Sequence, residues 1–326
     1  MGYTKKLFEY VFNREVQEGG SRVDIIGAAL KSFGMEDAQY DMIRHNENMT
    51  CKVMHEGQFY SLRIHQPIEG FSTRLITGYR NDTELMRSEV DLLLHMIRNG
   101  FDHLQKPMKN VQGEYVSEVG DGIPAMLLTW VEGTAIPEEE GAKYAEELGK
   151  LACRIHQAVK GFDGERIAYD DRLCDRMAEE IREAVAIGHL PAGVGQRCMR
   201  ELSVVRRTQD KYAREGRTTM IHADLSLGNI LITDHGLIPI DFSLSGYGSL
   251  AQEAGMLMSN YQDEDSCKRL LEGFSKAGEE IDATDADIFL VFSILLFICT
   301  HHNRVYREAW FRNALGMWCE SLFLHE

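Results

Sequence analysis

The sequence predicts an α+β fold in which a strand-rich first part precedes a larger, mainly helical part. Short apolar segments separated by polar turns occupy the first third of the chain. The rest has helical periodicity, apart from a β-rich stretch near residues 219–241. Strands that come before helices, rather than alternating with them, favour segregated layers. The 326 residues suffice for two lobes, and we expect the lobes to span residues 1–131 and 132–326.

Three strands are expected at the start of the first lobe, separated by a polar turn at residues 45–48 and a turn centred on Gly57: Gln39–Arg44, Thr50–Met54 and Phe59–His65. Successive side chains of a strand point to opposite faces. In the third strand, Arg63 therefore faces away from Leu62 and Ile64. Pro67 ends this strand because proline cannot donate a backbone hydrogen bond.

A helix and a buried strand complete the first lobe. Asn81 and Glu84 fit a capping box, and apolar residues then recur at helical spacing up to Ile97. Gly100 suits the left-handed position that ends many helices. The nearly unbroken apolar run of residues 124–131 predicts a buried strand.

The second lobe is expected to be built mainly from helices. One begins after Pro137 with three glutamates in its first turn and ends at Gly161, and others fill residues 170–215 with a break at 190–193. The most apolar run, residues 288–299, is shorter than the ~20 residues that a membrane span needs. We therefore expect it to form a buried core helix.

Charge and cysteine usage limit the classes of partner. The chain has 35 Lys+Arg and 51 Asp+Glu and a formal net charge of −16, which argues against nucleic acid and against an anionic membrane surface as partners. Seven scattered cysteines without a C-x-x-C pair suggest free thiols in a reducing compartment. Residues 1–12 contain no long apolar region, so no signal peptide is expected, and we predict a cytoplasmic protein.

The segment from Thr219 to Gly248 carries the chemistry. Its two apolar runs, separated by a turn at residues 234–236, predict a hairpin. Asn229 would start one strand and Asp241 would follow the other, so their side chains can meet at one end, and a loop can return Asp224 to the same place. Carboxylate and amide oxygens are ligands that suit Mg²⁺. The remaining carboxylate is free to accept a proton from a hydroxyl group.

These residues have the spacing of a kinase catalytic loop. The string H-x-D-x-x-x-x-N places His222, Asp224 and Asn229 in that order, and Asp241-Phe242 stands where the metal-binding Asp-Phe of kinases stands. Phosphoryl transfer depends mainly on positioning and charge neutralisation, which this set can supply. The alternative is a surface hairpin whose Asp and Asn residues serve only its turns.

The same segment resembles the aminoglycoside phosphotransferase/choline kinase-like family, whose motif runs His-Gly-Asp-Leu-His-x-Gly-Asn followed by Ile-Asp-Phe. Here the motif reads HADLSLGN at residues 222–229 and IDF at residues 240–242. The strand SLRIHQP at 61–67 is similar to that of a bacterial subgroup with homoserine-kinase-like and stress-response-kinase-like members. The resemblance spans residues 20–300 and implies a bilobal protein-kinase-like fold with ATP and Mg²⁺ as cofactors.

The resemblance also implies roles for residues in the catalytic segment. Asp224 would be the catalytic base, and His222 would brace the loop. Asn229 and Asp241 would hold Mg²⁺.

Further roles concern the nucleotide. Arg63 would take the place of the phosphate-binding lysine, with Glu89 as its helix partner and Glu84 as a rival. An arginine there keeps its charge and can bind two oxygens at once. A loop from Asn46 to Thr50, which includes Asn48, would cover the phosphates. Trp130 and Val131 would form the hinge that receives adenine through its backbone.

Three positions depart from the family pattern. Ala223 replaces the usual glycine, and Ser226 replaces a histidine or lysine that could assist the departing phosphoryl group. Glu253 stands where an aspartate is common, and we interpret it as structural.

We therefore expect a kinase that transfers the γ-phosphoryl group of MgATP, with GTP left open, to a hydroxyl group of a small molecule. The resemblance implies an aminoglycoside-, choline- or homoserine-like acceptor. Residues 263–287 hold nine acidic and three basic residues, which would suit a cationic acceptor or simply form a solvated helix face. The alternatives are a Ser/Thr protein kinase of the stress-response type and a nucleotide-binding pseudokinase.

Overall fold

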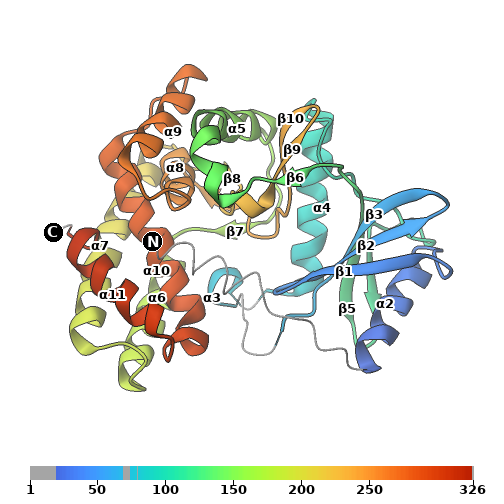
Figure 1. The fold of residues 1–326 in the computed structure, drawn as a ribbon, viewed down its shortest axis with the longest axis horizontal. Helices are drawn as coiled ribbons and strands as arrows, with labels where there is room; N and C mark the ends of the chain where they lie inside the picture. Colours follow the sequence, from blue (N-terminus) through green and yellow to red (C-terminus); the bar gives the residue numbers. More distant parts are fainter. Residues whose placement is uncertain (1–19, 69–73, 79, 325–326) are drawn as a thin grey trace.

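The computed structural model describes residues 20–68, 74–78 and 80–324, which form a sheet-based lobe and a larger helical lobe (Figure 1). The expectation of no signal peptide falls on residues 1–12, outside the described residues. The α+β class and the two-lobed architecture predicted from the sequence are confirmed. All seven cysteines are free thiols, also as predicted.

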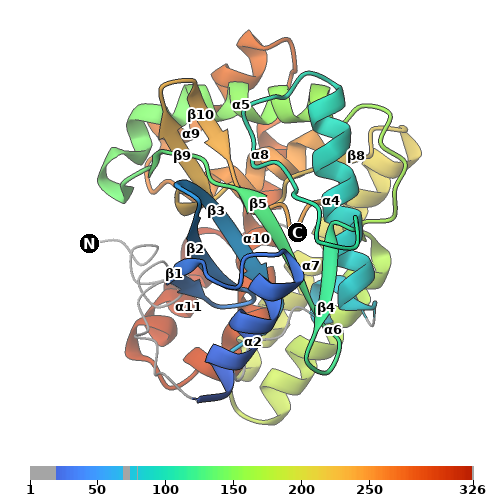
Figure 2. The same ribbon diagram turned by 90° about the vertical axis from the view of Figure 1, so that its right-hand side faces the viewer.

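The first lobe is a five-stranded antiparallel sheet in the order β1-β2-β3-β5-β4. Its strands are β1 (Gln39–His45), β2 (Met49–His55), β3 (Gln58–Ile64), β4 (Val116–Val119) and β5 (Ile123–Thr129). Helix α2 (Gly20–Ser32) packs on one face, and α4 (Asp82–Arg98) stands between the sheet and the helical lobe (Figures 1 and 2). The three strands and the helix expected between residues 39 and 98 are thus confirmed.

Strand alternation gives the sheet two distinct faces. Met49, Cys51 and Val53 of β2 are fully buried against α2. The intervening Thr50 and Lys52 lie on the other face, which looks toward the helical lobe. Arg63 of β3 shares that face, because it pairs with Thr50 across the β2–β3 ladder.

The capping predicted for α4 is also observed. The side chain of Asn81 accepts hydrogen bonds from the backbone N–H groups of Thr83 and Glu84. Gly100 follows the helix with a positive φ of 86°, as expected for the residue after a C-cap. The start of α4 is therefore fixed beside the cleft that separates the two lobes.

The second lobe is mainly helical, with two small three-stranded sheets, β10-β9-β6 and β7-β11-β8. Their strands are β6 (Thr134–Ala135), β7 (Ile167–Ala168), β8 (Thr219–Ile221), β9 (Ile230–Thr233), β10 (Gly236–Pro239) and β11 (Gly246–Gly248). Its longer helices are α5 (Ala145–Ala158), α6 (Asp171–Ala186), α7 (Ala192–Arg214), α8 (Leu250–Met258), α9 (Glu264–Lys276), α10 (Ala283–Val305) and α11 (Ala309–Ser321). The predicted break at residues 190–193 lies between α6 and α7. The segment after Pro137 differs from the prediction: residues Glu138–Tyr144 form a 3₁₀-helix before α5 begins.

Helix α10 is the central helix of this lobe. Its 23 residues make it long and apolar enough to cross a membrane by length and composition alone. It extends well beyond the apolar run predicted from the sequence, because polar residues at both of its ends continue the helix. Its phenylalanines Phe289 and Phe292 are fully buried, and the helix packs against α6, α7 and α8. The predicted role as a core helix is therefore observed.

Two glycines let α5 and α9 approach until their backbones touch. A Cβ atom on Gly273 would lie 2.1 Å from the carbonyl oxygen of Glu146, and one on Gly149 would lie 2.3 Å from that of Leu270. Real Cβ atoms do not approach backbone atoms this closely, so a larger residue at either position must push the helices apart.

We expect Gly273→Ala to lower the free energy of unfolding by about 3 kcal/mol, at the upper end of the range for overpacked cores. Urea denaturation measures the change. Gly316→Ala on α11 is the matched control, because a Cβ atom there meets nothing within 4 Å, and it should stabilise the protein by up to about 1 kcal/mol. Equal effects of the two variants would contradict the close packing of α5 and α9.

Candidate active site

The hairpin predicted from the motif segment is present and brings three polar residues to one end. Strands β9 (Ile230–Thr233) and β10 (Gly236–Pro239) pair in antiparallel register, and the backbone N–H of Ile240 donates to the carbonyl of Asn229 at 2.9 Å. Asn229 lies in a 3₁₀ turn immediately before β9. Its side-chain N–H donates to Oδ2 of Asp224 at 2.7 Å and to the carbonyl of Asp224 at 3.1 Å. The loop thus folds back as expected.

The surroundings shift the pKa values of the two aspartates of the site in opposite directions. Burial, and then the nearby charge of Asp241, raise the pKa of Asp224 to about 7. Burial also acts to raise the pKa of Asp241, but the guanidinium groups of Arg63 and Arg44 outweigh it and bring the pKa to about 2. Asp241 is therefore firmly anionic, whereas the Asp224 carboxyl is poised near neutrality to exchange a proton.

His222 braces the catalytic loop from inside. It is fully buried, and burial lowers its pKa to about 4, so the ring is neutral. Its Nδ1 accepts from the backbone N–H of Asp224 at 3.3 Å, which leaves Nε2–H to donate to the carbonyl of Ile240 at 3.2 Å. This geometry fits the bracing role predicted from the resemblance, since both ring nitrogens are hydrogen-bonded to backbone groups of the protein.

Glu253 of α8 holds the same loop by its backbone. Its carboxylate accepts from the N–H of His222 at 2.5 Å and from the N–H of Ala223 at 3.1 Å. Ala223 has a φ of +62°, in the region that favours glycine. Glu253 thus keeps an alanine in a conformation that costs it free energy, which agrees with the structural reading of this residue.

Arg63 and Glu89 form the ion pair that the resemblance implied. Nη1 of Arg63 donates to Oε1 of Glu89 at 2.6 Å, and Nη2 donates to Oδ1 of Asp241 at 3.0 Å. Both Arg63 and Glu89 are at least 96% buried. The rival Glu84 is exposed and accepts no bond from Arg63 among the described contacts. Arg63 therefore links the sheet, helix α4 and the hairpin.

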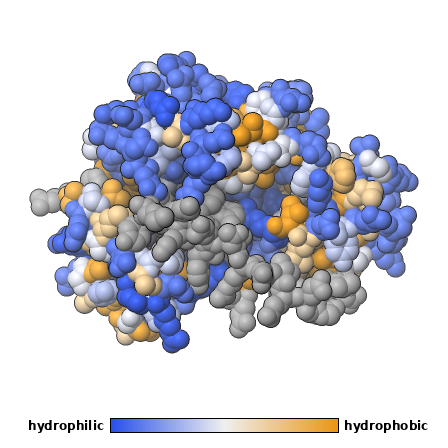
Figure 3. Space-filling view, viewed as in Figure 1, coloured by the Kyte–Doolittle hydropathy of each residue, from blue (hydrophilic) through white to orange (hydrophobic). Residues whose placement is uncertain are grey.

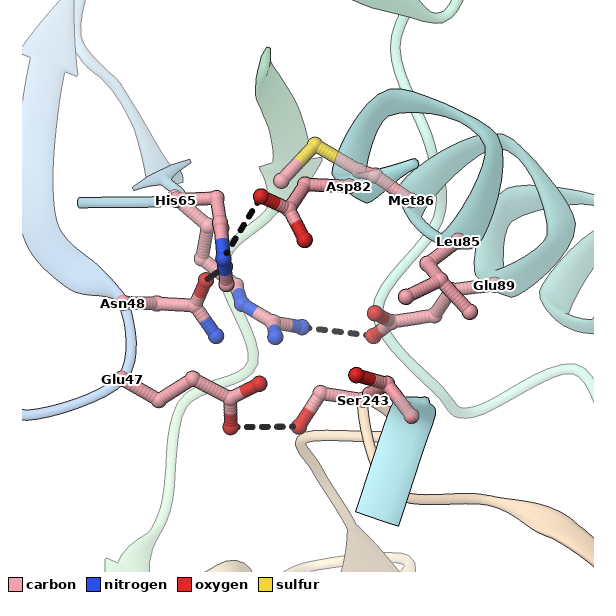
Figure 4. A pocket seen from close by; sticks show the side chains of 10 residues that line it. Glu47, Asn48, His65, Asp82, Leu85, Met86, Glu89 and Ser243 are labelled. Carbon is pink, nitrogen blue, oxygen red and sulfur yellow. Dashed lines mark hydrogen bonds and ion pairs between the residues drawn. The ribbon is translucent and has the colours of Figure 1, made fainter. Parts of the chain in front are cut away.

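The loop expected to cover phosphates forms one wall of a small pocket that is also lined by Arg63, Glu89 and Ser243. Figure 4 shows Asn48 beside His65, and Glu47 directed toward Ser243. Oδ1 of Asn48 is 3.1 Å from Nδ1 of His65, and Oγ of Ser243 donates to Oε2 of Glu47 at 3.5 Å. Burial, followed by the charge of Asp241, raises the pKa of Glu47 to about 8. The sequence did not point to Glu47, because acidic residues are not typical of phosphate loops.

The predicted hinge follows β5. The backbone N–H of Trp130 donates to the carbonyl of Phe59 at 3.2 Å and extends the β3–β5 ladder, and Val131 comes next, half-buried. The ammonium group of Lys52 lies 4.4 Å from the centre of the Trp130 ring and 4.3 Å from that of Phe59. Thr50, the other loop residue predicted to contact nucleotide, lies on β2 opposite Arg63.

Two arginines at the site were not predicted from the sequence. Arg44 of β1 donates to Oδ1 of Asn229 at 3.1 Å. Arg166, only 2% exposed, donates to four carbonyls and one hydroxyl: those of Leu85, Phe242, Ser243 and Ser245, and Oγ of Ser245. Neither arginine stands in a recognisable motif, so no signal in the sequence could have marked them.

Asn229 and Asp241 are chemically suited to a divalent cation. Both offer hard oxygen atoms, and one positively charged nitrogen, Nη1 of Arg44, lies 3.1 Å from Asn229 Oδ1 and 4.0 Å from Asp241 Oδ2. A cation therefore already fits between these oxygens. In the described part of the chain, no three His, Cys, Asp or Glu side chains cluster closely enough to hold a metal ion by themselves. Phosphate and water oxygens would therefore complete the shell around a cation held by Asn229 and Asp241.

Several acidic side chains of residues 263–287 cap helices or accept hydrogen bonds within the helical lobe. Asp263 and Asp282 cap α9 and α10, and Asp285 accepts hydrogen bonds from Lys211 and Tyr212. Hydrophilic residues cover the upper part of the helical lobe, where α9 lies (Figure 3). The prediction that this stretch faces a cationic acceptor stays a prediction.

Comparisons with solved structures agree with this architecture. A microcompartment-associated aminopropanol kinase has a TM-score of 0.73 and 19% identity over 93% of this chain and 99% of that chain. An amicoumacin kinase in complex with AMP-PNP, Ca²⁺ and Ami has a TM-score of 0.68 and 18% identity, covering 94% of this chain and 93% of that chain. At these identities the likeness shows the fold.

A choline kinase from Streptococcus pneumoniae gives a TM-score of 0.63 and 13% identity, covering 93% of this chain and 99% of that chain. A search among curated protein sequences found no significant match. The model of the phosphotransferase enzyme family, however, matches residues 46–287, which include β2 to β5 of the sheet, the catalytic loop and the hairpin. The family resemblance stated from the motifs is thereby confirmed: the chain belongs to the phosphotransferase enzyme family.

Proposed function

We propose that the protein is a kinase that transfers the γ-phosphoryl group of MgATP to a hydroxyl group of a small molecule. The observation that carries the proposal is the convergence of Asp224, Asn229 and Asp241 at the end of the β9–β10 hairpin. Arg63, which is paired with Glu89 of α4, faces them from the sheet and donates a hydrogen bond to Asp241. This is the set of groups that phosphoryl transfer requires.

Each residue has a chemical task in this reaction. Asp224 accepts the proton of the acceptor hydroxyl as its oxygen bonds to the γ-phosphorus and the bond to the bridging oxygen of the departing ADP breaks. Asn229 and Asp241 would hold Mg²⁺, which neutralises charge on the phosphates when bound. Arg63 binds phosphate oxygens, and its pairing with Glu89 fixes its direction. The fully buried His222 keeps Asp224 in place.

We take residues 1–131 and 132–326 as the two functional lobes. The nucleotide would bind in the cleft between them. The base would lie along the hinge, where the backbone at Trp130 and Val131 continues β5. The loop that contains Asn48 and Thr50 would cover the phosphates, since it leads from β1 into β2 on the face that carries Arg63.

The proposed acceptor is a small alcohol that carries an amino group. Three similar folds are kinases of aminopropanol, amicoumacin and choline, and the net charge of −16 favours a cationic ligand over an anionic one. A protein acceptor is less well supported. Only residues 242–249 separate Asp241 from α8, which leaves no long activation segment.

The test is a nucleotide-consumption assay with ATP and with GTP over a panel of hydroxyl compounds: amino alcohols, choline, homoserine, aminoglycosides, macrolides and neutral sugars. We expect ATP consumption that depends on an amine-bearing alcohol and on Mg²⁺. Phosphorylation of serine or threonine in added protein, with none of the small alcohols, would favour a protein kinase instead. Nucleotide binding without any turnover and without metal dependence would favour a pseudokinase.

A further inference from the structure

Arg44 crosses the cleft and contacts both proposed metal ligands. It comes from β1 of the sheet, yet its guanidinium donates to Asn229 at 3.1 Å and lies 4.0 Å from Asp241. The side chain is 29% exposed, so it remains open to the space where the phosphates would lie.

A β-bulge directs Arg44 to this place. In the β1–β2 ladder, Met42 pairs with Cys51 but Arg44 pairs with Thr50, so Ile43 is an extra residue and points to solvent with 52% exposure. An insertion of one residue reverses the faces of all the residues that follow it. Without the bulge, Arg44 would lie on the α2 side of the sheet. With it, Arg44 shares the cleft face with Thr50.

The helical lobe supplies no arginine or lysine to the reaction from its catalytic segment. Residues 218–267, which contain the catalytic loop and both metal ligands, include neither residue type, and Ser226 stands where the family often has a histidine or lysine. Arg63 of β3 donates to Glu89 and to one of the two proposed metal ligands, Asp241. The transferred group carries negative charge that catalysis must neutralise. Arg44 is a second sheet cation at the site, and it lies beside both proposed metal ligands.

We propose that Arg44 is a second cation of the phosphate site. Before nucleotide binds, it holds Asn229 and Asp241 together. With Asn229 and Asp241 holding a divalent cation, the guanidinium of Arg44 would instead bind the terminal phosphate. The planar fork of arginine suits both positions, since it can bind two oxygens side by side. This inference rests on the proposed function and adds a phosphate ligand to the same site.

We expect Arg44→Gln to raise the affinity for metal ion in the absence of nucleotide and to lower the affinity for nucleotide. Without nucleotide, the protein should bind Mn²⁺ several-fold more tightly, because the guanidinium no longer competes for Asn229 and Asp241. With Mg²⁺ and AMP-PNP, it should bind about 10- to 100-fold more weakly, because a charged hydrogen bond to phosphate is lost. Electron paramagnetic resonance of free Mn²⁺ measures the first effect, and titration calorimetry measures the second.

Two further variants make the test sharper. Arg87→Gln on α4 removes the same charge from a surface ion pair with Glu118 and should change neither affinity. Arg44→Lys keeps the charge but loses the fork, so it should weaken AMP-PNP binding about 10-fold or less. Thermal melting of each variant verifies that it is folded.

The result that would overturn the inference is an Arg44→Gln variant that binds Mg²⁺ and AMP-PNP as the wild type does. A Mn²⁺ affinity that stays the same or falls would overturn it as well, because the two cations would then not share oxygens. If the wild-type protein itself binds no nucleotide, the proposed function fails together with the inference. Failure of Arg44→Gln alone leaves the proposed function standing.

Discussion

Replacing Asp224 by asparagine should lower kcat by about 10³-fold, in line with the contribution of a positioned general base. The amide cannot take the proton of the acceptor hydroxyl, but its oxygen can still accept from the side chain of Asn229. Burial raises the pKa of Asp224, so the fold disfavours its charge, and the neutral amide should not destabilise the protein. Initial-rate kinetics with the best acceptor from the panel measure the loss.

The affinity for AMP-PNP should change little in Asp224→Asn, which separates chemistry from binding. Asp234→Asn, an exposed position in the turn of the same hairpin, makes the same chemical change outside the site and should keep full activity. An Asp224→Asn variant with wild-type kcat would show that another group takes the proton.

Replacing Arg166 by methionine should lower the free energy of unfolding by about 3–5 kcal/mol. The guanidinium makes five hydrogen bonds while almost fully buried. Methionine fills the space but takes the Arg166 donors from the carbonyls of Ser243 and Ser245, whereas the carbonyl of Phe242 still accepts from Ser245. Each buried acceptor left unpaired costs about 1–3 kcal/mol. Urea denaturation monitored by circular dichroism gives the change.

Activity should fall as well, because these carbonyls belong to the segment that follows Asp241. Arg172→Met, on the exposed start of α6, removes the same charge without such bonds and should stay within about 0.5 kcal/mol of the wild type. A loss of less than 1 kcal/mol in Arg166→Met would mean that the segment finds other donors.

The part of the site that the sequence predicts is the part held by short-range geometry. His222, Asp224 and Asn229 lie within eight residues, and the hairpin brings Asp241 to them through a local turn. Because successive side chains of a strand point to opposite faces, the sequence also correctly places Arg63 of β3 on the face opposite to Leu62 and Ile64. Its partner Glu89 could be proposed because the helix stripe places it near the apolar face that packs toward the sheet.

The residues that the sequence does not reveal depend on long-range placement. Arg44 reaches Asn229, 185 residues away, only because a bulge reverses its face, and the alternation pattern of β1 does not mark where a bulge falls. Arg166 contacts segments on both sides of the cleft from a stretch with no periodicity. The length of α10 was also underestimated, because apolar content marks burial but not where a helix ends.

The left-handed conformations of Ala223 and Asp241, with φ of +62° and +64°, have a consequence for the thermodynamics of ligand binding. Both residues hold unfavourable backbone angles before any ligand arrives, and Glu253 and Arg63 keep them there. The loss of conformational entropy is thus incurred when the chain folds. A ligand that enters this cleft meets catalytic-loop backbone that is already ordered, so little backbone entropy remains to be lost there when it binds.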